Sequence, residues 1–212
     1  MRIDVQGVIV PNDDAWIYDW FDMDHTAPRD VGKAIEQAKA ANEQLDVYIN
    51  SGGGDVFSGS EIYAALRAYN GAVRIHVTGI AASAASVIAM AGESDIAPTA
   101  QIMVHNVSTT TSGDYRDMEK SSEILQQANR AMAAAYVDKT GMPETDALDM
   151  MDAETWLTAA EAVAYGLIDE IAENQNDTAR MVASVGDMLP TSVIAKMKHE
   201  QQELLEYFGT ED

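Results

Sequence analysis

Apolar and polar residues alternate with a period of two in several short segments, and recur every three to four residues between them. The first pattern is typical of half-buried strands and the second of amphipathic helices. The segment 28–40, for example, places Val31, Ile35 and Ala38 on one helical face. Strands are expected at 1–10, 45–50, 72–79, 101–106 and 167–172, and helices at 28–40, 56–69, 81–92, 115–139 and 158–166.

Strands that alternate with helices predict an α/β fold with a mainly parallel sheet covered by helices. Beyond it, a polar segment at 173–180 leads to a further helical stretch that ends near Phe208. We therefore expect one domain over 1–172 and a polar linker with a helical C-terminal extension over 173–212. The extension could dock on the domain or tether a partner through its apolar residues, which are Val193, Ile194, Met197, Leu204, Leu205 and Phe208.

Composition narrows the classes of function. The formal net charge is −22, with the acidic residues spread along the chain, so a nucleic-acid partner is not expected. The sequence has no cysteine, which excludes disulfides, thiolate metal sites and cysteine nucleophiles. It shows neither a signal-peptide pattern nor an apolar stretch of about 18 residues, so we expect a soluble cytoplasmic protein without membrane contact.

Three consecutive glycines, Gly52, Gly53 and Gly54, follow the strand expected at 45–50. Glycine adopts positive φ without strain and leaves backbone N–H groups open to an anion or an oxyanion. A phosphate loop of the GxxxxGK[ST] type is excluded because no lysine occurs between Lys39 and Lys120. A tight turn from strand to helix is the alternative, and it accounts for two glycines better than for three.

Two serines, Ser83 and Ser86, lie in the run GIAASAAS that follows the strand at 72–79. A serine at a helix start is commonly only a cap. The same place suits a nucleophile, because the helix dipole and the next N–H group stabilise developing negative charge. Ser86 lies one turn further in, where a hydroxyl usually bonds back to the helix backbone. Ser83 is therefore the better candidate.

His105 ends the strand QIMVH. Alone, a histidine at a strand end is more often structural than catalytic. The carboxyl ends of parallel strands gather at one edge of a sheet, however, and sites form there. A glycine nest, Ser83 and His105 on three successive strand ends would supply an oxyanion hole, a nucleophile and a base. The remaining histidines lie in an acidic loop, inside a strand and in the C-terminal stretch: His25, His76 and His199.

These motifs, SGGG, GxAAS, MVH and ETWLTAAEAVAYGLIDEI, occur in the order seen in the proteolytic subunit of the Clp serine proteases, which the chain resembles over 1–172. The opening GVIVPNDDAWIYDWF is more similar to the Clp-type head maturation proteases of tailed phages. The resemblance implies a ClpP/crotonase-type fold of repeated β-α units. It also implies that the long helix at 115–139 is a handle between stacked rings, with Met118, Leu125, Ala128, Met132 and Ala135 on one face.

The resemblance also implies the site residues. Ser83 would be the nucleophile and His105 the general base, and the N–H groups of Gly54 and Ala84 would form the oxyanion hole. The acid falls at Glu154, where most members of the family carry aspartate. Asp152 is the alternative acid, and both could instead be ordinary solvated carboxylates ahead of a helix.

The expected function is an ATP-independent serine endopeptidase that cleaves scaffold or capsid proteins inside an assembling phage head in the host cytoplasm. We expect a homo-oligomeric ring and no metal or cofactor. The first strand is expected almost at Met1, without the preceding residues that meet an ATPase ring in housekeeping members. Three alternatives stay open, namely a housekeeping subunit with an unfoldase, a silent capsid-assembly protein, and an acyl-CoA hydratase or isomerase of the same superfamily. The last needs no serine–histidine pair.

Overall fold

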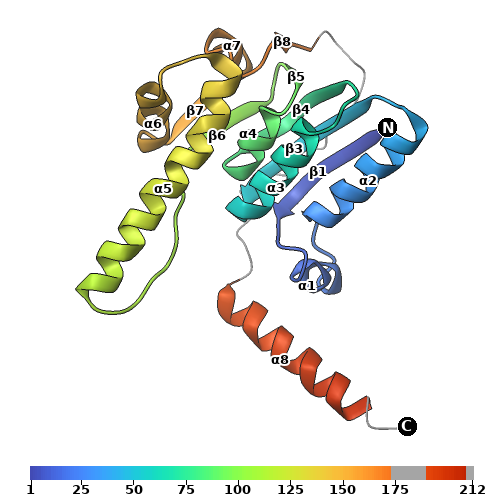
Figure 1. Cartoon of the computed structure of the whole chain (residues 1–212), viewed down its shortest axis with the longest axis vertical. Coiled ribbons are helices and arrows are strands. Elements are labelled where there is room, and N and C mark those ends of the chain that lie inside the picture. Colours follow the sequence, from blue (N-terminus) through green and yellow to red (C-terminus); the bar gives the residue numbers. More distant parts are fainter. Residues whose placement is uncertain (173–189, 209–212) are drawn as a thin grey trace.

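A mainly parallel sheet forms the centre of the computed structural model, which describes residues 1–172 and 190–208 (Figure 1). Its strands follow the order β2-β1-β3-β4-β5-β8, while β6 pairs with β4 and with β7. Among the pairings described, only that of β6 with β7 is antiparallel. The strands are β1 (Arg2–Ile9), β2 (His25–Thr26), β3 (Leu45–Gly54), β4 (Val73–Ala82), β5 (Glu93–Ile96), β6 (Gln101–Val104), β7 (Thr155–Thr158) and β8 (Glu170–Ile171).

Helices α2, α3 and α4 cover one face of this sheet, and the N-terminal half of α5 extends away from it (Figure 1). The α/β fold expected from the sequence is confirmed. The sequence did not predict α1, β2, β5, α6 or β7, all of which are short. The helices are α1 (Ala15–Trp20), α2 (Pro28–Ala41), α3 (Val56–Arg67), α4 (Ala84–Ala89), α5 (Tyr115–Thr140), α6 (Glu144–Asp152), α7 (Ala159–Ala164) and α8 (Thr191–Phe208).

Strands β3 and β4 are both longer than their alternating patterns predicted. β3 continues through its glycines to Gly54, and β4 runs to Ala82. The helix expected from residue 81 therefore begins only at Ala84. In β3, alternate residues such as Val47 and Ile49 point into the apolar core beneath the helices. The strands thus carry the candidate residues as far as the carboxyl edge of the sheet.

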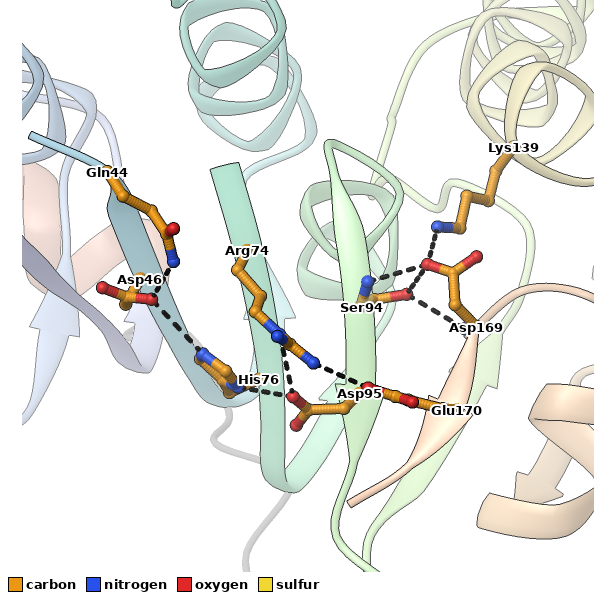
Figure 2. A network of polar contacts seen from close by, with 9 residues as sticks. All are labelled: Gln44, Asp46, Arg74, His76, Ser94, Asp95, Lys139, Asp169 and Glu170. Carbon is orange, nitrogen blue, oxygen red and sulfur yellow. Dashed lines mark hydrogen bonds and ion pairs between the residues drawn. The ribbon is translucent and has the colours of Figure 1, made fainter. Parts of the chain in front are cut away.

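The opposite face of the sheet carries polar side chains that join four strands, β3, β4, β5 and β8 (Figure 2). His76 Nδ1 lies 2.8 Å from Asp95 Oδ2, and its Nε2 lies 3.8 Å from Asp46 Oδ1. Arg74 continues the row with an ion pair of 2.6 Å to Glu170. His76 thus links β3, β4 and β5, at the end of the sheet away from Ser83.

The C-terminal end of α5 is attached to the sheet by Lys139, which contacts Asp169 and the carbonyl of Gly92 (Figure 2). Asp169 also accepts hydrogen bonds from the backbone N–H and the hydroxyl of Ser94. Partial burial by itself raises the pKa of Asp169, but the bonds from Lys139 and Ser94 outweigh it and hold that pKa below its ordinary value. The attachment is therefore present at neutral pH and is lost only as the pH falls through that lowered value.

The C-terminal extension is helical, as expected, over α8. Ile194 is buried in a second apolar cluster with Val8, Ile17 and Tyr18, and Lys198 forms an ion pair with Asp14. The side chains of Leu204, Leu205 and Phe208 and the linker predicted at 173–180 lie outside the described residues, so the domain boundary stays a prediction. No helix in the described ranges is long and apolar enough to cross a membrane.

Candidate active site

Ser83 occupies the sharp turn between β4 and α4. Its backbone has φ 55° and ψ −125°, and it is one of four non-glycine residues with positive φ in the described parts of the chain. Such a conformation strains a residue that has a side chain and persists only where its surroundings impose it. Here the Ser83 N–H donates to Met103 O at 2.9 Å, and the Ser83 carbonyl accepts from Ser86 N at 3.0 Å. These bonds hold the Ser83 hydroxyl at the carboxyl edge of the sheet.

His105 lies directly after β6, which pairs with the last residues of β4 in the register Ala82 to Met103. The two strand ends are therefore neighbours. His105 Nε2 lies 2.7 Å from Ser83 Oγ, within hydrogen-bond distance. The structure thus brings together the serine and the histidine that the sequence singled out. His25 instead contacts the backbone of Met23 through Nδ1.

Gly53 and Gly54 of β3 are required because atoms of neighbouring segments lie too close to leave room for a side chain. A Cβ atom at Gly53 would lie 2.7 Å from the Cβ of Ser83 and 3.0 Å from Ala84 N. A Cβ atom at Gly54 would lie 2.2 Å from the carbonyl oxygen of Ile9 in β1. Neither position has room for a side chain. The glycines therefore let β3 pass directly beside the Ser83 turn while it remains paired with β1.

The N–H groups predicted to form the oxyanion hole belong to the end of β3 and the start of α4. Asp55 N donates to Ile9 O in β1 at 2.8 Å, and the Gly53 N–H donates to Ser51 Oγ at 3.1 Å. Ala84 N begins α4 on the other side of the Ser83 turn. The oxyanion hole at Gly54 and Ala84 stays a prediction.

Glu154 and His105 both lie just beyond the end of the ladder that β6 and β7 form. The last pair of this antiparallel ladder is Val104 with Thr155, so the next positions outward are His105 and Glu154. Glu154 also has a positive φ of 49°. Its side chain is exposed, and no hydrogen bond joins it to His105 among the contacts described.

Asp152, the alternative acid, has a different partner. Its Oδ1 accepts a hydrogen bond of 2.7 Å from Asn106 Nδ2. Asn106 follows His105, and its own Oδ1 is buried without a hydrogen-bond partner in the described structure. The sequence analysis did not single out Asn106, although its position directly after the candidate base His105 could have identified it. Asp152 thus contacts the residue that follows His105, and the choice between Glu154 and Asp152 as the acid stays a prediction.

The family of the chain follows from comparison with known proteins. Residues 34–175 match the family model described as Clp protease. The chain belongs to the Clp protease family. Proteases of this family are serine peptidases. Within the family, the chain is 31% identical over 132 residues to an ATP-dependent Clp protease proteolytic subunit of Bacteroides fragilis, covering 61% of this chain and 64% of that protein.

A second Clp proteolytic subunit, from Pleurastrum terricola, is 35% identical over 137 residues, covering 62% of this chain and 68% of that protein. The chain thus spans about two thirds of the length of these curated Clp relatives. Among solved structures, a mutant of ClpP1 from Listeria monocytogenes superposes with a TM-score of 0.69 at 22% identity, covering 82% of this chain and 92% of that one. This likeness shows that the chain has the ClpP-like fold.

Proposed function

We propose that this member of the Clp family is a serine endopeptidase with Ser83 as nucleophile, His105 as general base and Glu154 as the acid. The observation that carries the proposal is the 2.7 Å contact between Ser83 Oγ and His105 Nε2. A nucleophile must lie within hydrogen-bond distance of its base. The pair also argues against a hydratase or isomerase of the same superfamily, which would need only the oxyanion hole.

The reaction would follow from this geometry in two steps. Ser83 Oγ attacks the carbonyl carbon of a peptide bond while His105 Nε2 takes the hydroxyl proton, and the N–H groups of Gly54 and Ala84 bind the oxyanion. The tetrahedral intermediate then collapses to an acyl-serine as His105 returns the proton to the leaving amine. Water, activated by the same imidazole, releases the acyl group and regenerates Ser83.

Within the family, we assign the chain to the ATP-independent proteases that process scaffold or capsid proteins during phage head assembly. The likeness of residues 7–21 to such proteases supports this assignment. In the structure this segment forms the end of β1 and helix α1, and it ends in two exposed aromatic residues, Trp20 and Phe21. A partnership with an unfoldase, and a silent role in capsid assembly, are the two alternatives.

Co-expression with phage capsid and scaffold proteins, in the absence of any ATPase, tests the assignment. The wild-type chain should generate discrete new termini in one of these proteins, and the Ser83→Ala variant should generate none. Mass spectrometry of the products identifies the termini. Cleavage only after an unfoldase and ATP are added would favour the housekeeping alternative, and intact proteins in every mixture would favour a silent role.

We also propose that the chain forms a homo-oligomeric ring, as proteins of the Clp family do. The predicted stripe on α5 is buried at its C-terminal end, where Met132 is 8% exposed, but Met118 near the N-terminal end is 40% exposed. Because this half of α5 extends away from the sheet (Figure 1), its apolar side chains are available to a second copy.

Light scattering of the purified chain should therefore give a mass several times 22.9 kDa. The Met118→Glu variant should shift the distribution to smaller species, because it places a charge on the apolar stripe. Gln127→Glu adds the same charge to the opposite face of α5 and is the control. A wild-type monomer at micromolar concentration would contradict the proposal.

A further inference from the structure

Two buried hydroxyl groups lie beneath the Ser83 turn, and the reaction steps above do not use them. Ser86 in α4 is 0% exposed, and Tyr136 in α5 is 3% exposed. Ser86 Oγ lies 2.6 Å from the carbonyl oxygen of Ser83 and 2.8 Å from the Tyr136 hydroxyl. The three groups form a continuous row from the long helix to the backbone of the candidate nucleophile.

The direction of these hydrogen bonds follows from the groups involved. A carbonyl oxygen can only accept, so the single proton of Ser86 Oγ points to Ser83 O. The Tyr136 hydroxyl must then donate to Ser86 Oγ. Burial raises the pKa of Tyr136 to about 12, against the opposing effect of the Ser86 hydrogen bond. The phenol therefore keeps its proton, and remains a donor, at any pH at which a histidine base works.

The carbonyl that receives these bonds belongs to the same peptide unit as the Ala84 N–H. A trans peptide is planar, and its C=O and N–H groups point in opposite directions. Fixing the Ser83 carbonyl therefore fixes the direction of the Ala84 N–H on the other side. The carbonyl also accepts from Ser86 N at 3.0 Å, so its plane is held by backbone and side chain together. Hydrogen bonds to a carbonyl further polarise the peptide and strengthen its N–H as a donor.

We infer that Ser86 and Tyr136 are positioning residues for the oxyanion hole, which hold the Ser83–Ala84 peptide so that the Ala84 N–H points at the developing oxyanion. The inference rests on the proposed serine peptidase function. This positioning would give α5 a second role besides self-association. The C-terminal end of α5 carries Tyr136 and is attached to the sheet through Lys139. Neither residue touches the substrate.

The test uses Ser86→Ala, Tyr136→Phe and the double variant, with hydrolysis of p-nitrophenyl acetate and labelling by a fluorophosphonate as readouts. Loss of an oxyanion donor costs about 10²–10³ in kcat, and a misdirected donor should cost less. We expect kcat to fall about tenfold in Ser86→Ala and by a smaller factor in Tyr136→Phe, with KM unchanged. The double variant should match Ser86→Ala, because the phenol acts only through Ser86.

Two further measurements separate positioning from plain stability. The pH at half-maximal rate should stay at the wild-type value, since the base is not altered. The inhibition constant of a peptide boronate, which forms a tetrahedral adduct on serine, should rise in parallel with the loss of kcat. Tyr69→Phe, which removes a phenol hydroxyl that donates to Glu43 O beside the amino-terminal end of β3, should leave kcat unchanged.

Wild-type kcat and labelling rate in both folded single variants would overturn the inference. Tyr136→Phe keeps the aromatic ring, so its kcat and labelling rate still test the inference even if Ser86→Ala lowers the melting temperature. A wild-type chain that no fluorophosphonate labels at Ser83 would overturn the peptidase function, and the inference with it. Labelling of Ser83 at equal rates in all variants would leave the peptidase function standing and the inference wrong.

Discussion

Replacing Ser83 with alanine should abolish labelling by a fluorophosphonate and lower the hydrolysis of p-nitrophenyl acetate by at least about 10³-fold. The reason is chemical, because the acyl group would have no oxygen to which it could be transferred. The fold should persist, since the backbone bonds of Ser83 to Met103 and Ser86 do not involve its side chain. Mass spectrometry of the labelled protein gives the site, and circular dichroism checks the fold.

Ser86→Ala is the matched control for this prediction, because it removes the neighbouring hydroxyl of the same run. It should still be labelled at Ser83, though more slowly. Ser86 Oγ is buried and its proton is engaged by a carbonyl, so it is a poor nucleophile. A label on Ser86 in the wild type, or a Ser83→Ala variant that is labelled as fast as the wild type, would show that the nucleophile is assigned wrongly.

The parts of the site that the sequence predicted best are those carried by strand ends. Alternation located the strands that precede Ser83 and His105, and parallel strands bring their carboxyl ends together. The distance between the two side chains also depends on the pairing of Ala82 with Met103, which no local pattern encodes. For the glycines, the sequence predicted their conformational freedom. The lack of room for a side chain at Gly53 and Gly54 results from the close approach of β1 and of the Ser83 turn, which the sequence cannot show.

Other parts of the site depend on elements too short to leave a pattern. β7 has four residues, and the sequence analysis did not expect it as a strand. Its antiparallel pairing brings the start of β7, which Glu154 precedes, to the end of β6, which His105 follows. The contact between Ser86 and Tyr136 joins residues 50 positions apart, so periodicity could place each on a helix face but could not pair them. These features are decided by which distant segments of the chain pack together, and not by the local propensity of each segment for helix or strand.

The positive φ of Glu154 is an argument for its role as the acid. Glu154 follows the C-cap of α6 and directly precedes β7, so the chain must reverse sharply at this residue. A glycine or asparagine would suit that backbone with less strain. A glutamate at that position, just beyond the strand pair that His105 follows, is the kind of local conflict that marks functional sites. This favours Glu154 over Asp152 as the acid.

Glu154→Gln should therefore lower kcat by about 10²–10⁴-fold, while Asp152→Asn should lower it only a few-fold. A carboxylate on the far imidazole nitrogen fixes the tautomer of the base and stabilises the imidazolium formed in the transition state. In a serine protease of another fold, changing the triad aspartate to asparagine costs about 10⁴ in kcat. Asp152 has its hydrogen bond to Asn106 instead, so its loss should act mainly on local packing. Both variants are compared with the wild type on p-nitrophenyl acetate and on a protein substrate.

Glu154→Asp completes the comparison. Glutamate is one methylene longer than aspartate, so the Glu154 carboxylate reaches further from the backbone that precedes β7. The shorter side chain should then fail to reach Nδ1, and Glu154→Asp should be impaired, although less than Glu154→Gln. If Glu154→Gln keeps near-normal turnover while Asp152→Asn loses it, the triad is Ser83, His105 and Asp152. In that event the Asn106 contact in the structure would have to exchange for one to His105 when substrate binds.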